Sequence, residues 1–250
     1  MAFNLEPWPY PFWFAHRGAG REAPENTLAA FRIGLEAGFQ AFECDVQLSL
    51  DGLPFLLHDA LLARTSNGQG LACAQTWAAL AQLDAGSWHS AKHAGEPLAS
   101  LAALEAFARS WGLHINLELK PSPGQAARVG AGVAHWLAAH WRAPMPLLSS
   151  FVPEALQAAT QVTSRPVRIA LLQEAWTPET PRLALRLGAA AVVCHHASLS
   201  AEAVAALHSA GLRALAYTVN EVTEARRLRE AGVDGLITDC MGLPNQLTVP

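Results

Sequence analysis

One stretch of the chain carries the pattern of its fold, residues 209–239, which read SAGLRALAYTVNEVTEARRLREAGVDGLITD. A helix-like segment ends in glycine and an apolar, β-rich run follows, first at Gly211 and again at Gly232. Glycine just past a helix is a common left-handed cap, and it lets the chain turn into a strand. The spacing from 211 to 232 suits one strand plus one helix. This stretch therefore predicts parallel strands joined by helices.

The same joint recurs upstream, at Gly38, Gly112 and Gly188. The apolar runs give eight expected strands, at residues 12–15, 41–47, 114–119, 146–150, 167–172, 191–194, 212–219 and 234–238. Eight strand–helix units predict an α/β protein with one (β/α)8 TIM-type barrel over residues 1–250. An open doubly wound sheet is the alternative, but residues 16–20 contain only Gly-x-Gly and not the full G-x-G-x-x-G turn.

Residues 59–97 break this period between the second and third units. The segment contains Gly, Ser and Gln together with Trp77 and Trp88. We expect a small insertion over the barrel mouth, with a short helix near residues 76–83. Insertions at this end of a barrel often shape the site, although an ornament without function is the other interpretation.

Composition narrows the class of protein further. Hydrophobic residues make up 51% of the 250 residues and charged residues 15%, which favours a large core and argues against disorder. The net charge of -4 and the absence of a basic cluster predict no nucleic-acid partner and no polybasic membrane patch. Four widely separated cysteines have no zinc spacing, which fits a reducing compartment.

The sequence also contains no apolar run of the roughly 18 residues that a membrane-spanning helix needs. The N-terminus is aromatic and broken by proline, unlike the charged-then-apolar layout of a signal peptide. We therefore expect a cytoplasmic protein without stable membrane association.

Charged side chains gather where the first three expected barrel strands end. The active site of such a barrel lies at the C-terminal ends of its strands. Alternation along a strand puts Glu43 and Asp45 on one face and Glu118 and Lys120 on one face, while their apolar neighbours face the helices. The first strand ends in His16 and Arg17. These charged residues are expected to face the barrel interior.

Three carboxylates in one cavity would repel one another and be costly to bury, unless a cation joined them. The set Glu43, Asp45 and Glu118 offers only oxygen ligands, which favours Mg²⁺ or Ca²⁺ over zinc or copper. The other interpretation is an ordinary Glu118–Lys120 ion pair with the remaining acids paired elsewhere.

Basic and titratable residues beside these acids suit a phosphate ester. Arg17 can bind phosphate oxygens with two hydrogen bonds, and Lys120 adds a point charge. His16 and His58 can transfer protons near neutral pH. The residues alone thus indicate metal-assisted phosphoester cleavage by a histidine pair.

Three further residues lie at strand ends. His195 and His196 end the sixth expected strand and are rival candidates for substrate contact. Asp239 ends the last strand, where it either lines the mouth or caps the following turn.

Six short motifs occur in a fixed order along the chain: HRG at 16–18, PENT at 24–27, E-x-D at 43–45, DG at 51–52, HD at 58–59 and E-x-K at 118–120. This ordered set resembles the glycerophosphodiester phosphodiesterase family over about residues 14–239. The resemblance implies a barrel with a small insertion and a divalent cation. It also implies a small-molecule substrate, a glycerophosphodiester, cleaved to glycerol 3-phosphate and an alcohol.

The resemblance also implies roles for individual residues. His16 would be the base and His58 the acid, and the attacking group would be water or the glycerol 2-hydroxyl of the substrate. Tyr217 stands where the family often has tryptophan, so it would keep an aromatic face over the glycerol or serve as plain packing. The implied metal ligands are Glu43, Asp45 and Glu118, and the implied phosphate contacts are Arg17 and Lys120.

Two other functions remain as alternatives. A related barrel phosphodiesterase acting on lysophospholipids or phosphoinositides would need an apolar rim or anchor. The N-terminal aromatics Phe3, Trp8, Tyr10, Phe12 and Trp13 could supply one, but we expect them to plug the bottom of the barrel. A non-catalytic phosphate-binding barrel would have lost a histidine or carboxylate, and all five are present.

One hairpin is expected to bring His58 to the site. Asp51-Gly52 is a strong signal for a two-residue turn, which would pair Gln47 with Leu56 and Asp45 with His58. Residues 46–57 would then form a β-ribbon, and Pro54 would make its return strand an edge.

Overall fold

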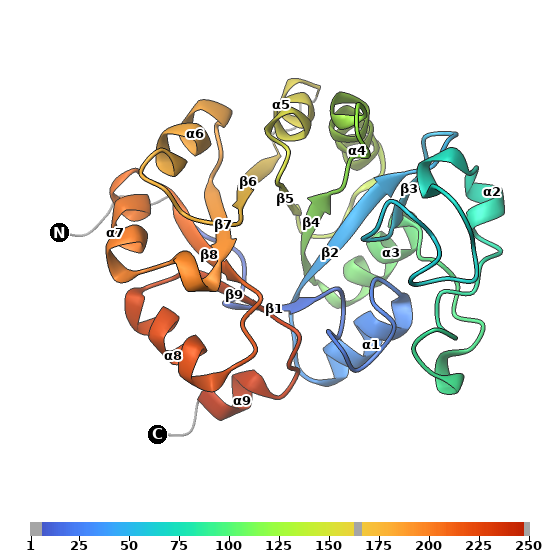
Figure 1. The fold of residues 1–250 in the computed structure, drawn as a ribbon, viewed down its shortest axis with the longest axis horizontal. Coiled ribbons are helices and arrows are strands. Elements are labelled where there is room, and N and C mark those ends of the chain that lie inside the picture. Colours follow the sequence, from blue (N-terminus) through green and yellow to red (C-terminus); the bar gives the residue numbers. More distant parts are fainter. Residues whose placement is uncertain (1–6, 163–166, 248–250) are drawn as a thin grey trace.

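Eight parallel strands close into a barrel in the computed structural model, which describes residues 7–162 and 167–247 (Figure 1). Closure follows because β1 (Trp13–His16) pairs with both β2 (Ala41–Leu48) and β9 (Gly235–Thr238). The strands between them follow chain order: β4 (His114–Leu119), β5 (Leu147–Ser150), β6 (Arg168–Gln173), β7 (Ala191–His195) and β8 (Arg213–Tyr217). The predicted TIM-type barrel is confirmed, with strand ends displaced by one or two residues.

Helices surround the barrel and cover its outer face (Figure 1). They are α1 (Leu28–Glu36), α3 (Leu101–Trp111), α4 (Ala126–His140), α5 (Pro153–Gln161), α6 (Thr180–Leu187), α7 (Ala201–Ser209) and α8 (Val222–Ala231), with α9 (Leu243–Leu247) after the last strand. Thr27 caps α1, since its hydroxyl accepts a hydrogen bond from Ala30 N. The left-handed glycine caps expected from the sequence are present, as at Gly112 and Gly188.

Two apolar layers hold the barrel together. The larger lies between the strands and the helices, and includes Phe31, Phe42 and Trp141. A smaller one fills the lower barrel around Phe14, and Tyr10 belongs to it. Burial of this apolar surface is the main force that stabilises the fold.

The N-terminal aromatics divide between these layers. Trp8 packs with Tyr10 against the lower cluster and closes the bottom of the barrel, as expected. Phe12 and Trp13 instead pack against the outer layer, so for them the expectation was wrong. Phe3 lies outside the described residues.

The ribbon after β2 exists, but its predicted register was wrong by one residue. β3 (Pro54–Leu56) runs antiparallel to β2 and pairs Gln47 with Phe55, not with Leu56. The turn has three residues, because Ser49 N donates to Leu53 O across residues 50–52. Gly52 takes the left-handed conformation at φ +82°, so only one turn residue needs positive φ.

Residues after the ribbon build a small core of their own beside β2 and β3. Its short elements are η1 (Ala72–Ala74), α2 (Trp77–Leu80) and η2 (Ala91–His93). Leu62, Leu80 and Leu98 pack there against Phe55 and Leu57 from the ribbon. Helix α2 is a single turn, shorter than expected, because the next hydrogen bonds join residues three apart: Gln82 N donates to Ala79 O and Leu83 N donates to Leu80 O. Within the described residues, no helix has the length and apolar character to cross a membrane.

Candidate active site

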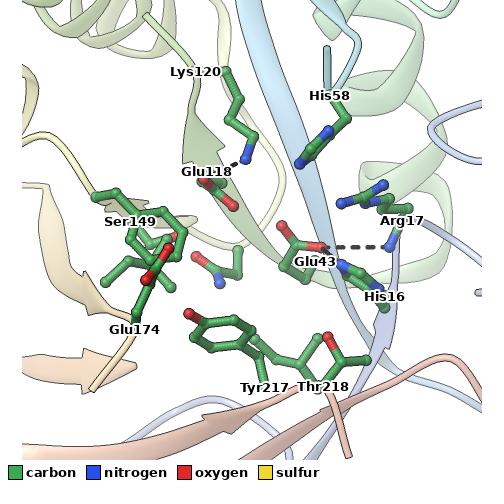
Figure 2. Close-up of a pocket in the computed structure, with 14 residues that line it drawn as sticks. His16, Arg17, Glu43, His58, Glu118, Lys120, Ser149, Glu174, Tyr217 and Thr218 are labelled. Atoms are coloured by element: carbon green, nitrogen blue, oxygen red, sulfur yellow. Dashed lines mark hydrogen bonds and ion pairs between the residues drawn. The ribbon is translucent and has the colours of Figure 1, made fainter. Parts of the chain in front are cut away.

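A cavity of about 260 Å³ opens at the C-terminal ends of the barrel strands (Figure 2). Seven of the eight site residues expected from the sequence line it, and the eighth, Asp45, lies buried behind them. The complete lining is His16, Arg17, Glu43, His58, Asn116, Glu118, Lys120, Ser149, Phe151, Leu172, Glu174, Tyr217, Thr218 and Ile237.

Three acidic side chains converge on one side of this cavity. Glu43, Asp45 and Glu118 each place an oxygen within 4.8 Å of the other two. They meet because β2 and β4 are neighbours whose register sets Asp45 opposite Glu118. All three are buried. Asp45 Oδ1 is also buried and accepts no hydrogen bond from the described residues, although Lys120 Nζ lies 3.4 Å from it. A cluster of buried carboxylate oxygens, one of which accepts no hydrogen bond, fits a hard divalent cation.

The electrostatics of the cluster point the same way. Burial raises the pKa of Glu43 well above its usual range, and the negative charges of Asp45 and Glu118 add to this. Burial, with the Asp45 charge, raises the pKa of Glu118 to about 7. Burial alone would also raise the pKa of Asp45, but Arg17 and Lys120 outweigh it and lower the pKa. Without a cation, the site holds one ionised acid beside two that resist ionisation.

Asn26 fixes the orientation of Asp45. Its side-chain amide donates to Asp45 Oδ2 at 2.8 Å and its oxygen accepts from Asp45 N at 3.1 Å. Asn26 adopts φ 60°, a left-handed conformation that asparagine tolerates better than most residues. In this structure the PENT motif therefore positions Asp45 in the acidic cluster through Asn26.

The two basic residues stand at the rim of the cluster (Figure 2). Arg17 Nε lies 3.3 Å from Asp45 Oδ2, and its Nη1 donates to Glu25 at 2.9 Å. Lys120 Nζ lies 2.7 Å from Glu118 and 3.4 Å from Asp45. The ion pair between Glu118 and Lys120 considered from the sequence thus exists within the cluster. A site with this charge pattern suits a phosphate group beside a cation.

Each of the two expected histidines has one ring nitrogen bound to a carboxylate. His16 Nδ1 lies 2.6 Å from Asp239 Oδ1, and His58 Nδ1 lies 2.6 Å from Asp59 Oδ1. In both rings this leaves Nε2 for a substrate. His16 Nε2 lies 3.7 Å from Glu43. Burial lowers the pKa of His58, so its protonated ring gives up a proton more readily.

Gln47 holds the loop that carries His58. Its side-chain amide donates to Leu57 O at 2.9 Å and to Asp59 O at 2.7 Å. Leu57, not His58, lies opposite Asp45, because Leu57 N donates to Asp45 O at 3.1 Å. The expected pairing of Asp45 with His58 was therefore wrong, yet His58 still reaches the cavity.

Aromatic side chains form another wall. Tyr217 packs edge-to-face against Phe151 and against His195, with ring centroids 5.9 and 5.8 Å apart. Its hydroxyl donates to Gln173 O at 3.3 Å. His195 and His196 do not line the cavity, and His196 Nδ1 instead binds Glu224 at 2.7 Å.

Several residues of the site were missed or left open in the sequence. Asp239 was expected to line the mouth or to cap the following turn, but it is not among the residues that line the cavity, and its carboxylate binds His16 and Asn220. Asn220 lies two residues before α8, which begins at Val222, and no motif marked it as a residue that supports the site. Asn116 and Ser149 line the cavity, and strand alternation from Glu118 would have found Asn116 two positions earlier.

Known proteins are similar to this chain in sequence and in fold. The glycerophosphoryl diester phosphodiesterase family matches residues 16–243. A glycerophosphodiester phosphodiesterase of Caldanaerobacter subterraneus is 30% identical over 229 residues, covering 90% of this chain and 92% of that protein.

Solved structures agree. A phosphodiesterase of Oleispira antarctica in complex with the product sn-glycerol-3-phosphate is 32% identical, with a TM-score of 0.88 and 95% of each chain covered. A glycerophosphodiester phosphodiesterase from Agrobacterium tumefaciens is 26% identical, with a TM-score of 0.75, covering 93% of this chain and 97% of that one. The chain therefore belongs to the glycerophosphoryl diester phosphodiesterase family.

Proposed function

We propose that this protein hydrolyses glycerophosphodiesters to glycerol 3-phosphate and an alcohol, using a divalent cation and two histidines. The observation that carries the proposal is one cavity lined by both histidines, the basic pair and two of the three clustered acids. Family membership and the product complex of the Oleispira antarctica relative support the substrate class.

Glu43, Asp45 and Glu118 would hold the cation, Mg²⁺ or Ca²⁺, because they supply a buried all-oxygen set. A cation held there would supply positive charge that stabilises the negative charge developing on the phosphate. Arg17 and Lys120 would bind and orient the phosphate from the rim of the cluster.

The histidines would move the protons. His16 Nε2, with Asp239 on the other ring nitrogen, takes a proton from the attacking group, which is water or the glycerol 2-hydroxyl. A cyclic phosphate formed by the 2-hydroxyl would then be opened by water to give glycerol 3-phosphate. His58 Nε2, with Asp59 on its other nitrogen, gives a proton to the departing alcohol oxygen. Each carboxylate keeps its ring in one tautomer and one orientation. Tyr217 lies across the cavity from Lys120 (Figure 2), and its ring would cover the substrate from that wall.

Hydrolysis of glycerophosphocholine and glycerophosphoethanolamine, followed as glycerol 3-phosphate release, tests the proposal. Activity should disappear in excess chelator and return with Mg²⁺ or Ca²⁺. Glu43→Gln, Asp45→Asn and Glu118→Gln should each weaken binding of the cation while the fold survives, and the exposed Glu179→Gln should behave as wild type. Full activity in chelator would contradict the metal, and phosphate binding without turnover would favour a non-catalytic barrel.

A further inference from the structure

Two buried polar side chains of the cavity have hydrogen-bonding atoms that the fold does not use. Asn116 is 1% exposed and Ser149 is 0% exposed. Among the residues that the structure describes, none forms a hydrogen bond with Asn116 Nδ2, Asn116 Oδ1 or Ser149 Oγ. Leaving such atoms unpaired in a protein interior is costly, so an unpaired buried group calls for an explanation.

The barrel register places both residues beside the acidic cluster. Asn116 lies next to Glu43 across the β2–β4 pair, and Ser149 lies next to Glu118 across the β4–β5 pair. Asn116 and Glu118 on β4, and Lys120 directly after it, follow one another from the depth of the barrel toward its mouth. Neighbouring inward positions are about 7 Å apart, since each residue advances the strand by about 3.3 Å.

The cavity wall across from Asn116 and Ser149 is mostly apolar. Tyr217, Leu172 and Ile237 line the same cavity with an aromatic ring and two aliphatic side chains. Tyr217 and Ser149 both line this cavity, and Figure 2 draws them together with the charged residues. A ligand arm in this space therefore meets hydroxyl and amide groups on one side and carbon on the other.

We propose that Asn116 and Ser149 bind the free hydroxyl groups of the glycerol arm of the substrate and select glycerol esters over their deoxy analogues. This proposal rests on the proposed function, since the phosphate must be held at Arg17 and Lys120 for the arm to reach down. A hydroxyl both donates and accepts, and the asparagine amide and the serine hydroxyl offer both partners. A site built to bind a hydroxyl discriminates strongly against an analogue that lacks it, because its buried polar groups then remain unpaired.

The test compares glycerophosphocholine with the phosphocholine ester of propane-1,2-diol, in which the terminal hydroxyl is missing and the 2-hydroxyl remains. Keeping the 2-hydroxyl leaves both possible nucleophiles in place. Wild-type kcat/KM should favour the glycerol ester by at least about 100-fold. Ser149→Ala and Asn116→Leu should each reduce that preference at least about tenfold, mainly by lowering kcat/KM for the glycerol ester.

Thermal unfolding without substrate separates this role from a structural one. Ser149→Ala should not lower the Tm, because Ser149 Oγ has no partner within the described residues. Ser150 is the matched control on the same strand, where its hydroxyl donates to Leu119 O at 2.8 Å and accepts from Val152 N at 3.1 Å. Ser150→Ala should lower the Tm and leave the substrate preference as in wild type.

The outcomes are distinct. If wild type cleaves neither ester, the proposed function fails. If wild type cleaves both esters equally, or if Ser149→Ala and Asn116→Leu lower both rates by the same factor, the hydrolysis stands and the inference about Asn116 and Ser149 is wrong.

Discussion

His16 and Asp239, which lie at the ends of the neighbouring strands β1 and β9, are joined by a 2.6 Å hydrogen bond between Nδ1 and Oδ1. Asn220 holds the other oxygen of Asp239 at 2.9 Å and accepts a hydrogen bond from Asp239 N. The first and last strands of the barrel thus meet at the ring of one histidine, and barrel closure itself orients that ring.

Asp239→Asn should lower kcat by about 10- to 1000-fold, because His16 loses the partner that fixes its tautomer. Steady-state kinetics with glycerophosphocholine measure the effect. His208 and Asp234 form a second pair of this kind, at 2.8 Å, and neither residue lines the cavity. Asp234→Asn should therefore cost stability and leave kcat near wild type. Equal kcat losses in both variants would contradict a specific role for Asp239.

Substrates with different leaving groups should separate the two histidines. His16→Ala and His58→Ala should each lower kcat by about 10²–10⁴-fold on glycerophosphocholine. The glycerophosphoryl ester of p-nitrophenol needs little protonation as it leaves, so it should partly restore the rate of His58→Ala only. If this ester restored the rate of His16→Ala instead, His16 would be the acid and His58 the base.

Stability in chelator should depend on pH through Glu118. Its pKa of about 7 in the folded protein lies above the value of about 4.5 expected when unfolded. Between these values the folded state binds the proton and the unfolded state does not, so the free energy of unfolding falls as pH rises. The loss by pH 7 is on the order of 3 kcal/mol. Urea unfolding of wild type and Glu118→Gln from pH 5 to pH 8 measures it.

The glutamine in Glu118→Gln cannot ionise, so this variant should lose less stability than wild type between pH 5 and pH 8. In chelator at pH 8 its free energy of unfolding should be higher than that of wild type. Mg²⁺ or Ca²⁺ should restore wild type more than the variant. Parallel pH profiles for the two proteins would show that Glu118 is not the group responsible.

Much of this architecture could be predicted from local patterns. Glycine caps and apolar runs are short-range signals, and they predicted all eight strands of the barrel. Alternation along β2 and β4 predicted that Glu43, Asp45 and Glu118 converge, because neighbouring parallel strands bring inward positions together.

The rest depends on contacts that no local pattern encodes. Asp51-Gly52 favours a two-residue turn, but Ser49 Oγ binds Asp51 at 2.6 Å and accepts from Leu53 N, which stabilises a longer loop and shifts the register. The partnership of Asp239 with His16 spans almost the whole chain and exists only because the barrel closes. The local sequence around Asp51 and around Asp239 does not reveal whether these contacts form.

Arg64 links the two motifs that carry His58 and Arg17, and it comes from the segment after β3. It binds Asp59, the partner of His58, through Nε at 2.5 Å and Nη2 at 3.1 Å. It also binds Glu25, the partner of Arg17, through both terminal nitrogens at 2.8 and 2.7 Å. The half-exposed guanidinium of Arg64 therefore binds both Asp59, which contacts His58, and Glu25, which contacts Arg17.

Arg64→Met should lower kcat/KM on glycerophosphocholine at least about tenfold with only a small drop in Tm, since the Arg64 guanidinium is half-exposed and Arg17 still pairs with Glu25. The loss should be smaller on the p-nitrophenol ester, because Asp59 acts through the acid His58. Combining Arg64→Met with Asp59→Asn should cost less than the sum of the two changes. Arg182→Met, which removes an exposed arginine paired with Glu179, is the matched control and should behave as wild type. Equal losses on both esters, or strict additivity with Asp59→Asn, would mean that Arg64 does not act through His58.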